Sequence, residues 1–155
     1  MQIDVSASET LLFPECIELI AGAARDGLVG RLAVSTDRAP IVEPVTFDYE
    51  DRAIVVHPGT GPLADSAPGS LVAFEVDDVD KETLEAWSVL VRGLAISRDL
   101  ANSREDAYRR RTPLDLLNAR EPKAINKILV VRLDVVTGRR FVLDIPATRS
   151  EHAQA

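Results

Sequence analysis

The stretch "LVGRLAVST", Leu28 to Thr36, decides the fold, because from this point hydrophobic and polar side chains alternate with a period of two. Such alternation is typical of a β-strand with one buried face. The preceding stretch "FPECIELIAGAARDG", Phe13 to Gly27, instead spaces its apolar residues as one face of a helix does. Pro14 suits the first turn of that helix and Gly27 suits its end. The sequence therefore predicts an N-terminal helix followed by strands.

Further strand-like runs follow at short intervals. Connectors such as "DRAP" and "EDR" are too short for helical crossovers and favour hairpins. Two segments, Asp99–Arg111 and Thr112–Ala119, interrupt the strands and are expected to be helical. The expected strands are "LVGRLAVST", "IVEPVTFDY", "AIVVH", "SLVAFEVD", "WSVLVRGLAIS", "KILVVRLDVV" and "RRFVLDI", and "TGRR" is expected to be the turn between the last two.

Six or seven antiparallel strands must hide their edges, and closing into a small barrel achieves this. We therefore predict a mainly β fold, an antiparallel barrel with the N-terminal helix and one or two further helices outside it. A chain of 155 residues, 46% of them hydrophobic, forms about one domain. We expect a single domain over 1–155, with its core at about 13–146 and a loose tail at 147–155.

Charge and composition exclude several classes of function. Twenty-five acidic against eighteen basic residues give a net charge of −7, which opposes binding to nucleic acid. Neither a signal peptide nor a membrane span is visible, so we expect a cytoplasmic protein with no membrane partner. Cys16 is the only cysteine and is expected in the core, and the two histidines, His57 and His152, are too few to suggest a metal site.

Motifs for hydrolases and nucleotide triphosphatases are missing: there is no G-x-S-x-G, G-x-x-x-x-G-K-[ST] or G-x-G-x-x-G after a strand. The stretch "GTGPL", Gly59 to Leu63, has the composition of a loop whose backbone a phosphate can approach. No Lys or Arg accompanies it between Ala53 and Asp80. The acids in that interval are Asp65, Glu75, Asp77, Asp78 and Asp80.

The order of short segments along the chain is more specific than any one motif. A helix containing "EC" leads into "VGRLAVS", "PIVEPV", "VAFEVDDVD", "WSVLVRG" and finally "VTGRR", between Phe13 and Val142. This order resembles the pyridoxamine 5'-phosphate oxidase-like family, whose members are flavin-binding split β-barrels. The resemblance implies a homodimer with its cofactor, FMN or the deazaflavin F420, at the interface between subunits, and a small-molecule substrate.

The resemblance also implies which residues surround the cofactor. The second and third strands would lie under the flavin, the glycine loop would hold its phosphate, and the partner subunit together with the final turn would approach from the other side. These positions are Glu43, Pro44, Val45, Thr46, His57 and Pro58, then Gly59, Thr60 and Gly61 in the loop up to Leu63, then Trp87 and Ser88 of the partner, and Arg139 and Arg140. Hydride transfer would run through flavin N5, so no catalytic side chain is assigned.

Several of these positions also fit a purely structural role. Val45 and Thr46 fit a barrel wall, and Trp87 fits a plug at the barrel end. Two further arginines, Arg31 and Arg92, fit strand-surface charges or contacts to an anion.

The chain departs from the family in its phosphate loop, where relatives usually carry basic residues. Three hypotheses remain. In an FMN enzyme, Arg31, Arg139 or Arg140 would replace the missing base, with backbone N–H groups of Thr60 and Gly61 completing the site. In an F420 enzyme, Arg109–Arg111 and Lys123–Lys127 would have to bind the acidic tail. The third is a degenerate dimer that has lost flavin and binds another small ligand or a protein. Vitamin B6 oxidation itself is not expected.

Overall fold

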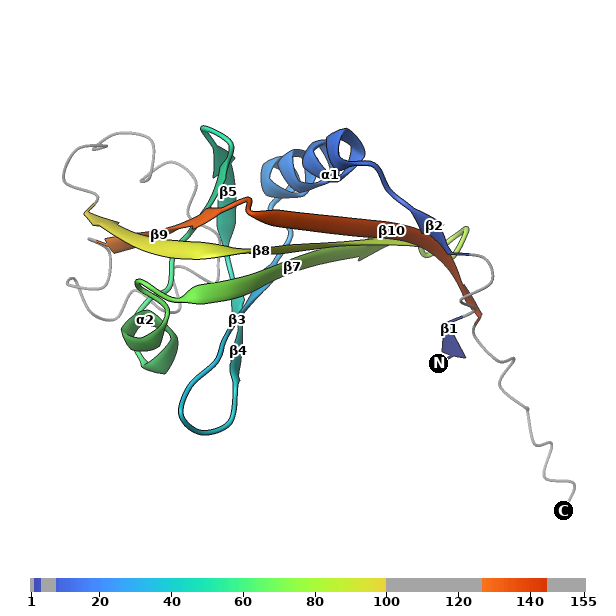
Figure 1. Cartoon of the computed structure of the whole chain (residues 1–155). Coiled ribbons are helices and arrows are strands. Elements are labelled where there is room, and N and C mark those ends of the chain that lie inside the picture. Colours follow the sequence, from blue (N-terminus) through green and yellow to red (C-terminus); the bar gives the residue numbers. More distant parts are fainter. Residues whose placement is uncertain (1, 4–7, 100–126, 145–155) are drawn as a thin grey trace, which may run out of the picture.

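The computed structural model describes residues 2, 3, 8–99 and 127–144. Apart from Asp99, the two helices expected between Asp99 and Ala119 lie outside these residues, as do His152 and the expected tail at 147–155. In the described part the chain forms ten strands and two helices, and the sheet curls beneath helix α1 (Figure 1). Every strand pair is antiparallel, so the predicted mainly β, antiparallel split-barrel class is confirmed.

Helix α1 spans Phe13–Asp26, as predicted. The Glu15 carboxylate accepts a hydrogen bond from the backbone N–H of Leu12 at 2.7 Å, which satisfies one of the free donors at the helix start. Gly27 ends the helix in the left-handed conformation, with φ of 71°. The face that α1 turns to the sheet carries Cys16, Ile20 and Ala23, all buried.

The strands form one curled sheet with the order β4-β3-β7-β8-β9-β6-β5, and β10 branches from β8. Side chains inside the curl, from the sheet and both helices, form one continuous core. The strands are β3 (Gly30–Val34), β4 (Ile41–Val45), β5 (Phe47–Glu50), β6 (Ala53–Val56), β7 (Leu71–Val79), β8 (Glu85–Asp99), β9 (Lys127–Arg132) and β10 (Val135–Asp144), with the short strands β1 (Gln2–Ile3) and β2 (Glu9–Thr10) paired to β10.

The single strand predicted for "IVEPVTFDY" is two strands, β4 and β5, divided at Thr46. Val45, Thr46 and Phe47 are buried in succession, which breaks the alternation and marks a bend from one part of the sheet to another. The carbonyl of Thr46 still accepts a hydrogen bond from the N–H of His57 at 3.4 Å. Because β4 and β5 are the two ends of the sheet path, this bend joins the ends and curls the sheet.

Strand β8 changes its partner at Gly93. Before Gly93 it pairs with β10, and after it with β9. A Cβ at Gly93 would overlap the carbonyl of Arg132, so a side chain would block the crossing of the strands. The turn from β9 to β10 is fixed there by Asp134, whose carboxylate accepts a hydrogen bond from the N–H of Leu94 at 3.2 Å.

The prediction that "TGRR" forms a turn is wrong: Thr137 to Arg140 lie within β10, and the turn lies at Leu133 and Asp134. Gly138 suggested a turn, but its role is to let strand β10 pack closely beneath α1. A Cβ at Gly138 would lie 2.6 Å from the sulfur of Cys16. The small residue therefore allows the helix to approach the sheet.

The loop predicted for Gly59 to Leu63 is shorter than expected. Helix α2 spans Pro62–Ser66, with Gly61 as its N-cap residue. Leu63 is buried in the core rather than lining a loop, because the short helix turns it inward. Neither helix in the described residues has the length and apolar character needed to cross a membrane.

Candidate functional site

Strands β3, β4, β7, β8 and β10 share an outer face, opposite the core. Strand register places Pro44, Arg31, Glu75, Leu90 and Thr137 in one row across these five strands. Because side chains alternate along a strand, neighbouring residues point to the opposite side. We call this side of the sheet the outer face.

Alternation divides the predicted residues of the second strand. Pro44 is exposed on the outer face, whereas Glu43 and Val45 lie opposite Leu32 and Gly30 and so point the other way. Val45 is part of the core. Thr46 is also buried, at the bend. The barrel-wall interpretation therefore fits Val45, and among the predicted residues of β4 Pro44 has a side chain available to a ligand on the outer face.

Arg31 is held by two carboxylates on the neighbouring strand. One of its guanidinium nitrogens lies 2.8 Å from Glu75 and 3.1 Å from Asp77. The hydrogen bonds that Arg31 donates to Asp77 and Glu75 raise its pKa above the ordinary value. The other carboxylate oxygen of Glu75 accepts a hydrogen bond from the hydroxyl of Ser88 at 3.2 Å. This network neutralises Arg31, which weakens the hypothesis that it replaces the missing phosphate-binding base.

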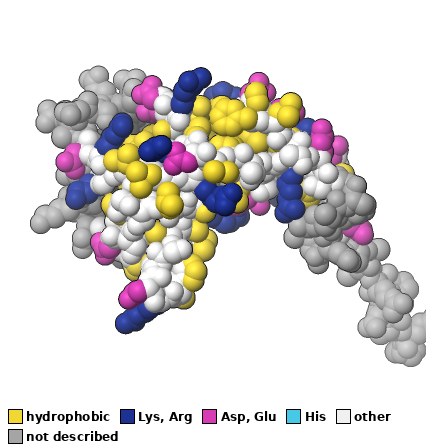
Figure 2. Space-filling view, viewed as in Figure 1, with side chains coloured by type: hydrophobic (Ala, Val, Ile, Leu, Met, Phe, Trp, Pro, Cys, Tyr) yellow, Lys and Arg dark blue, Asp and Glu magenta, His cyan; other side chains and the backbone are white. Residues whose placement is uncertain are grey.

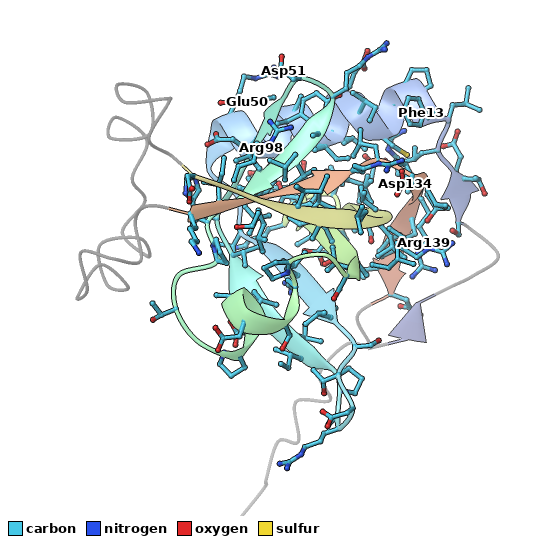
Figure 3. The ribbon with its side chains drawn as sticks, turned by 60° about the vertical axis from the view of Figure 1, so that its left-hand side comes forward. Phe13, Glu50, Asp51, Arg98, Asp134 and Arg139 are labelled. Carbon is cyan, nitrogen blue, oxygen red and sulfur yellow. The ribbon has the colours of Figure 1, made fainter. Side chains whose placement is uncertain are left out.

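The structure brings together the four residues that were expected to approach the flavin from the other side. On the adjacent strands β8 and β10, Arg139 pairs with Ser88 and Arg140 pairs with Trp87. Alternation then puts Ser88 and Arg139 on the outer face, and Trp87 and Arg140 on the opposite side. Arg139 also lies over the ring of Phe141, with its guanidinium carbon 5.2 Å from the ring centre. Figure 3 shows Arg139 well along β10 from Asp134.

His57 follows strand β6 and is half-buried. Its Nε2 atom lies 4.0 Å from a carboxylate oxygen of Asp48 on β5. Pro58 is also half-buried, and the chain then enters the glycine loop. The β5–β6 hairpin thus positions the His57 side chain at the end opposite its tip. The tip carries Glu50 and Asp51 and lies far from Arg139 (Figure 3).

The loop Gly59–Thr60–Gly61 has an open, unusual backbone. Gly59 and Gly61 have φ of 63° and 122°, which a residue with a side chain rarely adopts. A Cβ at either position would meet no atom within 4 Å, so space lies beside the backbone. The loop geometry fits an approaching phosphate, but its only nearby charge in sequence, Asp65, is acidic and exposed. The residues present therefore fit a flavin phosphate through backbone N–H groups alone.

The two halves of the predicted site do not converge within one chain. Strands β3 and β7 lie between β4, which carries Pro44, and β8, which carries Ser88. Three strand spacings of about 4.8 Å separate these residues by about 14 Å or more. One chain alone therefore does not place both sets around a single flavin ring.

Sequence reasoning missed some residues of this face. Glu75 and Asp77 appeared only as part of an acidic stretch, and their pairing with Arg31 depends on strand register. Asp48 was missed as the neighbour of His57 for the same reason. The face also holds a groove with a volume of about 440 Å³, lined in part by Arg92. The sequence had already marked Arg92, as an anion contact or a strand-surface charge, but it did not reveal the groove.

Comparisons with known proteins agree with this fold. The family model described as "Pyridoxamine 5'-phosphate oxidase" matches residues 14–140. An uncharacterised protein from Mycobacterium tuberculosis is 28% identical over 123 residues, which are 74% of this chain and 76% of that protein.

Two solved structures extend the comparison. One, described as an FAD binding protein from Mycobacterium smegmatis, is 26% identical with a TM-score of 0.61, over 87% of this chain and 99% of the other. An FAD-binding protein from Mesorhizobium loti has a TM-score of 0.65 at 21% identity, over 86% and 96% of the two chains, and shows the fold alone.

Proposed function

This chain belongs to the pyridoxamine 5'-phosphate oxidase family, and on that premise we propose that it binds a flavin and acts as an oxidoreductase on a small-molecule substrate. The observation that carries the proposal is the open backbone of the loop Gly59–Gly61, which leaves room for a phosphate at the position where the resemblance implies that one is bound. The flavin can be FMN, as the sequence suggested, or FAD, because both contain the same ring and first phosphate.

When bound, a flavin supplies hydride transfer through its ring. The protein contributes position and surroundings. Pro44 and His57 would lie beside the ring, backbone N–H groups of Thr60 and Gly61 would donate to the phosphate, and Arg139 would add the missing positive charge. No side chain is assigned to a proton-transfer step.

We further propose that the active form is a homodimer. The residues expected around one flavin lie about 14 Å or more apart within one chain. A second copy would bring its outer-face residues Ser88 and Arg139 to the Pro44 and His57 of the first, and by two-fold symmetry the reverse contact would complete a second site.

A degenerate, flavin-free binding module is the second candidate. The observation that favours it is the ion pairing of Arg31 with Glu75 and Asp77, which removes the base closest to Pro44 in the strand register. The F420 hypothesis has less support: Lys127 lies opposite Asp99 in the β8–β9 pair, and its other candidate residues lie outside the described part of the chain.

The test is a titration of the purified apo protein with flavin, in which the quenching of Trp87 fluorescence reports binding. Trp87 is the single tryptophan, so the signal has one source. Saturable quenching by FMN or FAD at micromolar or lower concentration is expected, together with a flavin absorption band in freshly purified protein. Colourless protein that shows no quenching by FMN, FAD or F420 would leave the flavin-free module as the function.

A further inference from the structure

The groove on the outer face has the size of a small-molecule site. It lies between the β3–β4 hairpin, the start of β7, the middle of β8 and the β9–β10 turn, with a volume of about 440 Å³. Ligand sites are typically about 300 to 1,000 Å³. Figure 2 shows hydrophobic side chains along one side of the β3–β4 hairpin and charged side chains at its tip. The apolar lining of the groove includes Ala33, Pro40, Leu71, Ala73 and Val135.

Two alanines form the floor of the groove. Ala33 on β3 pairs with Ala73 on β7, and strand register continues this row to Arg92 on β8 and Val135 on β10. A methyl group rises less from a sheet than the longer side chains beside it, so the row is low over β3 and β7. Leu71 and Val135, both exposed, stand next to this floor. The groove therefore suits a ligand with a flat apolar body.

Arg92 places a positive charge without a counter-charge at one end of the floor. In the part of the chain that the structure describes, no carboxylate pairs with Arg92. Asp134 also lines the groove, but its carboxylate is held by Arg132 at 2.9 Å and by the N–H of Leu94 at 3.2 Å. A guanidinium can donate two parallel hydrogen bonds to one anionic group. Arg92 therefore favours a ligand that carries such a group.

The charges around the groove favour a carboxylate over a phosphate. A carboxylate carries one negative charge, whereas a phosphate monoester carries about 1.5 to 2 at pH 7. Among the described residues that line the groove, Arg92 is the single basic one, and the acidic Asp134 lies there too. One guanidinium compensates a carboxylate and would leave excess negative charge on a phosphate, in a chain whose net charge is already −7.

The other end of the floor adjoins the position proposed for the flavin ring. Arg31 pairs with Pro44, and Ala33 is two residues further along β3 on the same face. Two residues of a strand span about 7 Å, so a ring over Pro44 would have a ligand over Ala33 as its neighbour. Arg92 lies two strands beyond Ala33. Two strand spacings are about 10 Å, which matches the length of a two-ring aromatic acid.

We propose that this groove is the substrate site and that the substrate is a flat, apolar monocarboxylate. Arg92 donates hydrogen bonds to the carboxylate, and the apolar body lies on Ala33 and Ala73 beside the flavin ring. The inference rests on the proposed flavin function and deepens it by naming the class of substrate. Arg92 binds and orients this substrate and takes no part in electron transfer.

A second copy or an apolar peptide fits the groove less well. Such a partner would remove Arg92 from water without a counter-charge, which costs free energy. A small carboxylate supplies that counter-charge and fills a concave site.

The experiment uses three probes that share one ring system: 2-naphthoate, the neutral 2-naphthamide and 2-naphthyl phosphate. Calorimetry measures their dissociation constants with the flavin-loaded protein, as wild type, Arg92→Ala and Ala73→Leu, which adds bulk to the floor. Arg98→Ala is the matched control, because Arg98 is exposed on the same strand outside the groove. The flavin absorption band, recorded during each titration, reports whether the probe lies beside the ring.

The wild type is expected to bind 2-naphthoate at least tenfold more tightly than either other probe, with a shift of the flavin band. Arg92→Ala should reduce the preference for 2-naphthoate over 2-naphthamide to less than twofold. Ala73→Leu should weaken both of these probes at least tenfold, and Arg98→Ala should change neither.

No binding of 2-naphthoate, equal affinity for the acid and the amide, or tighter binding of the phosphate would overturn the inference and leave the flavin function standing. So would binding that leaves the flavin band unchanged, because the groove would then lie apart from the ring. Ala73→Leu that changes oligomeric state and leaves 2-naphthoate affinity unchanged would show that a second copy covers the groove, which also overturns it.

If the protein binds no flavin, the proposed function fails, and the same titrations of the apo protein decide the carboxylate site. Binding of 2-naphthoate that depends on Arg92 supports that site, and absence of binding overturns it as well. Thermal melting of each variant identifies misfolding, in which case the preference of the wild type for the acid over the amide decides.

Discussion

The guanidinium of Arg31 lies 2.8 Å from the carboxylate of Glu75 across the β3–β7 pair. The same carboxylate accepts a hydrogen bond from Ser88, so it connects three neighbouring strands on the outer face. Arg31 is close to Pro44 in register, yet its charge is already compensated by Glu75 and Asp77. A guanidinium held in this way has little left to offer a phosphate.

Arg31→Ala should therefore change flavin affinity by less than about threefold. It should lower the free energy of unfolding by at most about 1 kcal/mol, since the ion pairs are partly exposed and such pairs contribute little. Fluorescence titration and chemical denaturation measure the two quantities. A tenfold loss of flavin affinity would show instead that Arg31 leaves its carboxylates and binds the cofactor.

Arg139→Ala and Arg140→Ala should differ from each other, because the two side chains point to opposite faces of β10. Arg139 shares the outer face with Ser88, so its loss should weaken flavin binding tenfold or more, equivalent to about 1.4 kcal/mol. Arg140→Ala serves as the control and should have little effect. Unchanged affinity in both variants would eliminate the hypothesis that either arginine replaces the missing loop base.

Two glycine substitutions should shift stability in opposite directions. Gly93→Ala forces a Cβ into the carbonyl of Arg132 and should lower the free energy of unfolding by about 3 kcal/mol or more. Gly22→Ala lies inside α1, where a Cβ would meet Arg25 at an ordinary 3.7 Å, and should raise it by about 0.5–1 kcal/mol. Urea denaturation of both variants checks the signs, and a stable Gly93→Ala would mean that the strand crossing is looser than described.

Cys16 should react slowly with thiol reagents in the native protein. It is 1% exposed, and burial raises the pKa of its thiol, with Glu15 adding to the effect. Because the folded-state pKa lies above that of the unfolded chain, the thiol's contribution to stability is present below about pH 9 and is lost as pH rises above it. Labelling with Ellman's reagent should proceed at the rate of unfolding, and rapid labelling at pH 8 would contradict this.

The homodimer should be detectable by light scattering at micromolar concentration, with twice the 16.9 kDa mass of one chain. Mixing two inactive variants gives a sharper test, one altered at Gly61 and the other at Ser88. If each site combines residues of two subunits, mixed dimers regain one intact site and part of the flavin binding. A strictly monomeric protein that still binds flavin would contradict the shared-site arrangement.

The spacing of apolar side chains was enough to predict α1 and most strands, and the short connectors were enough to predict antiparallel pairing, since both are local features of the sequence. The errors occurred where a residue has a long-range role. Gly138 suggested a turn but makes room for Cys16, and the strand through Thr46 bends because its two halves pair with different neighbours. The pairing of Arg31 with Glu75 depends on register between strands 44 residues apart, which no local pattern reveals.

The bend at Thr46 has a consequence for how the barrel is assembled during synthesis. Among the described strands, the β5–β6 hairpin pairs with the rest of the sheet only through β9, near the end of the chain. Until β9 emerges from the ribosome, this hairpin has no strand pairing with the rest of the sheet and is held by the chain at Thr46 and by packing against α1 and Phe74. Completion of the barrel is therefore a late step, and a chain cut short before Lys127 would lack the strand that joins this hairpin to β8.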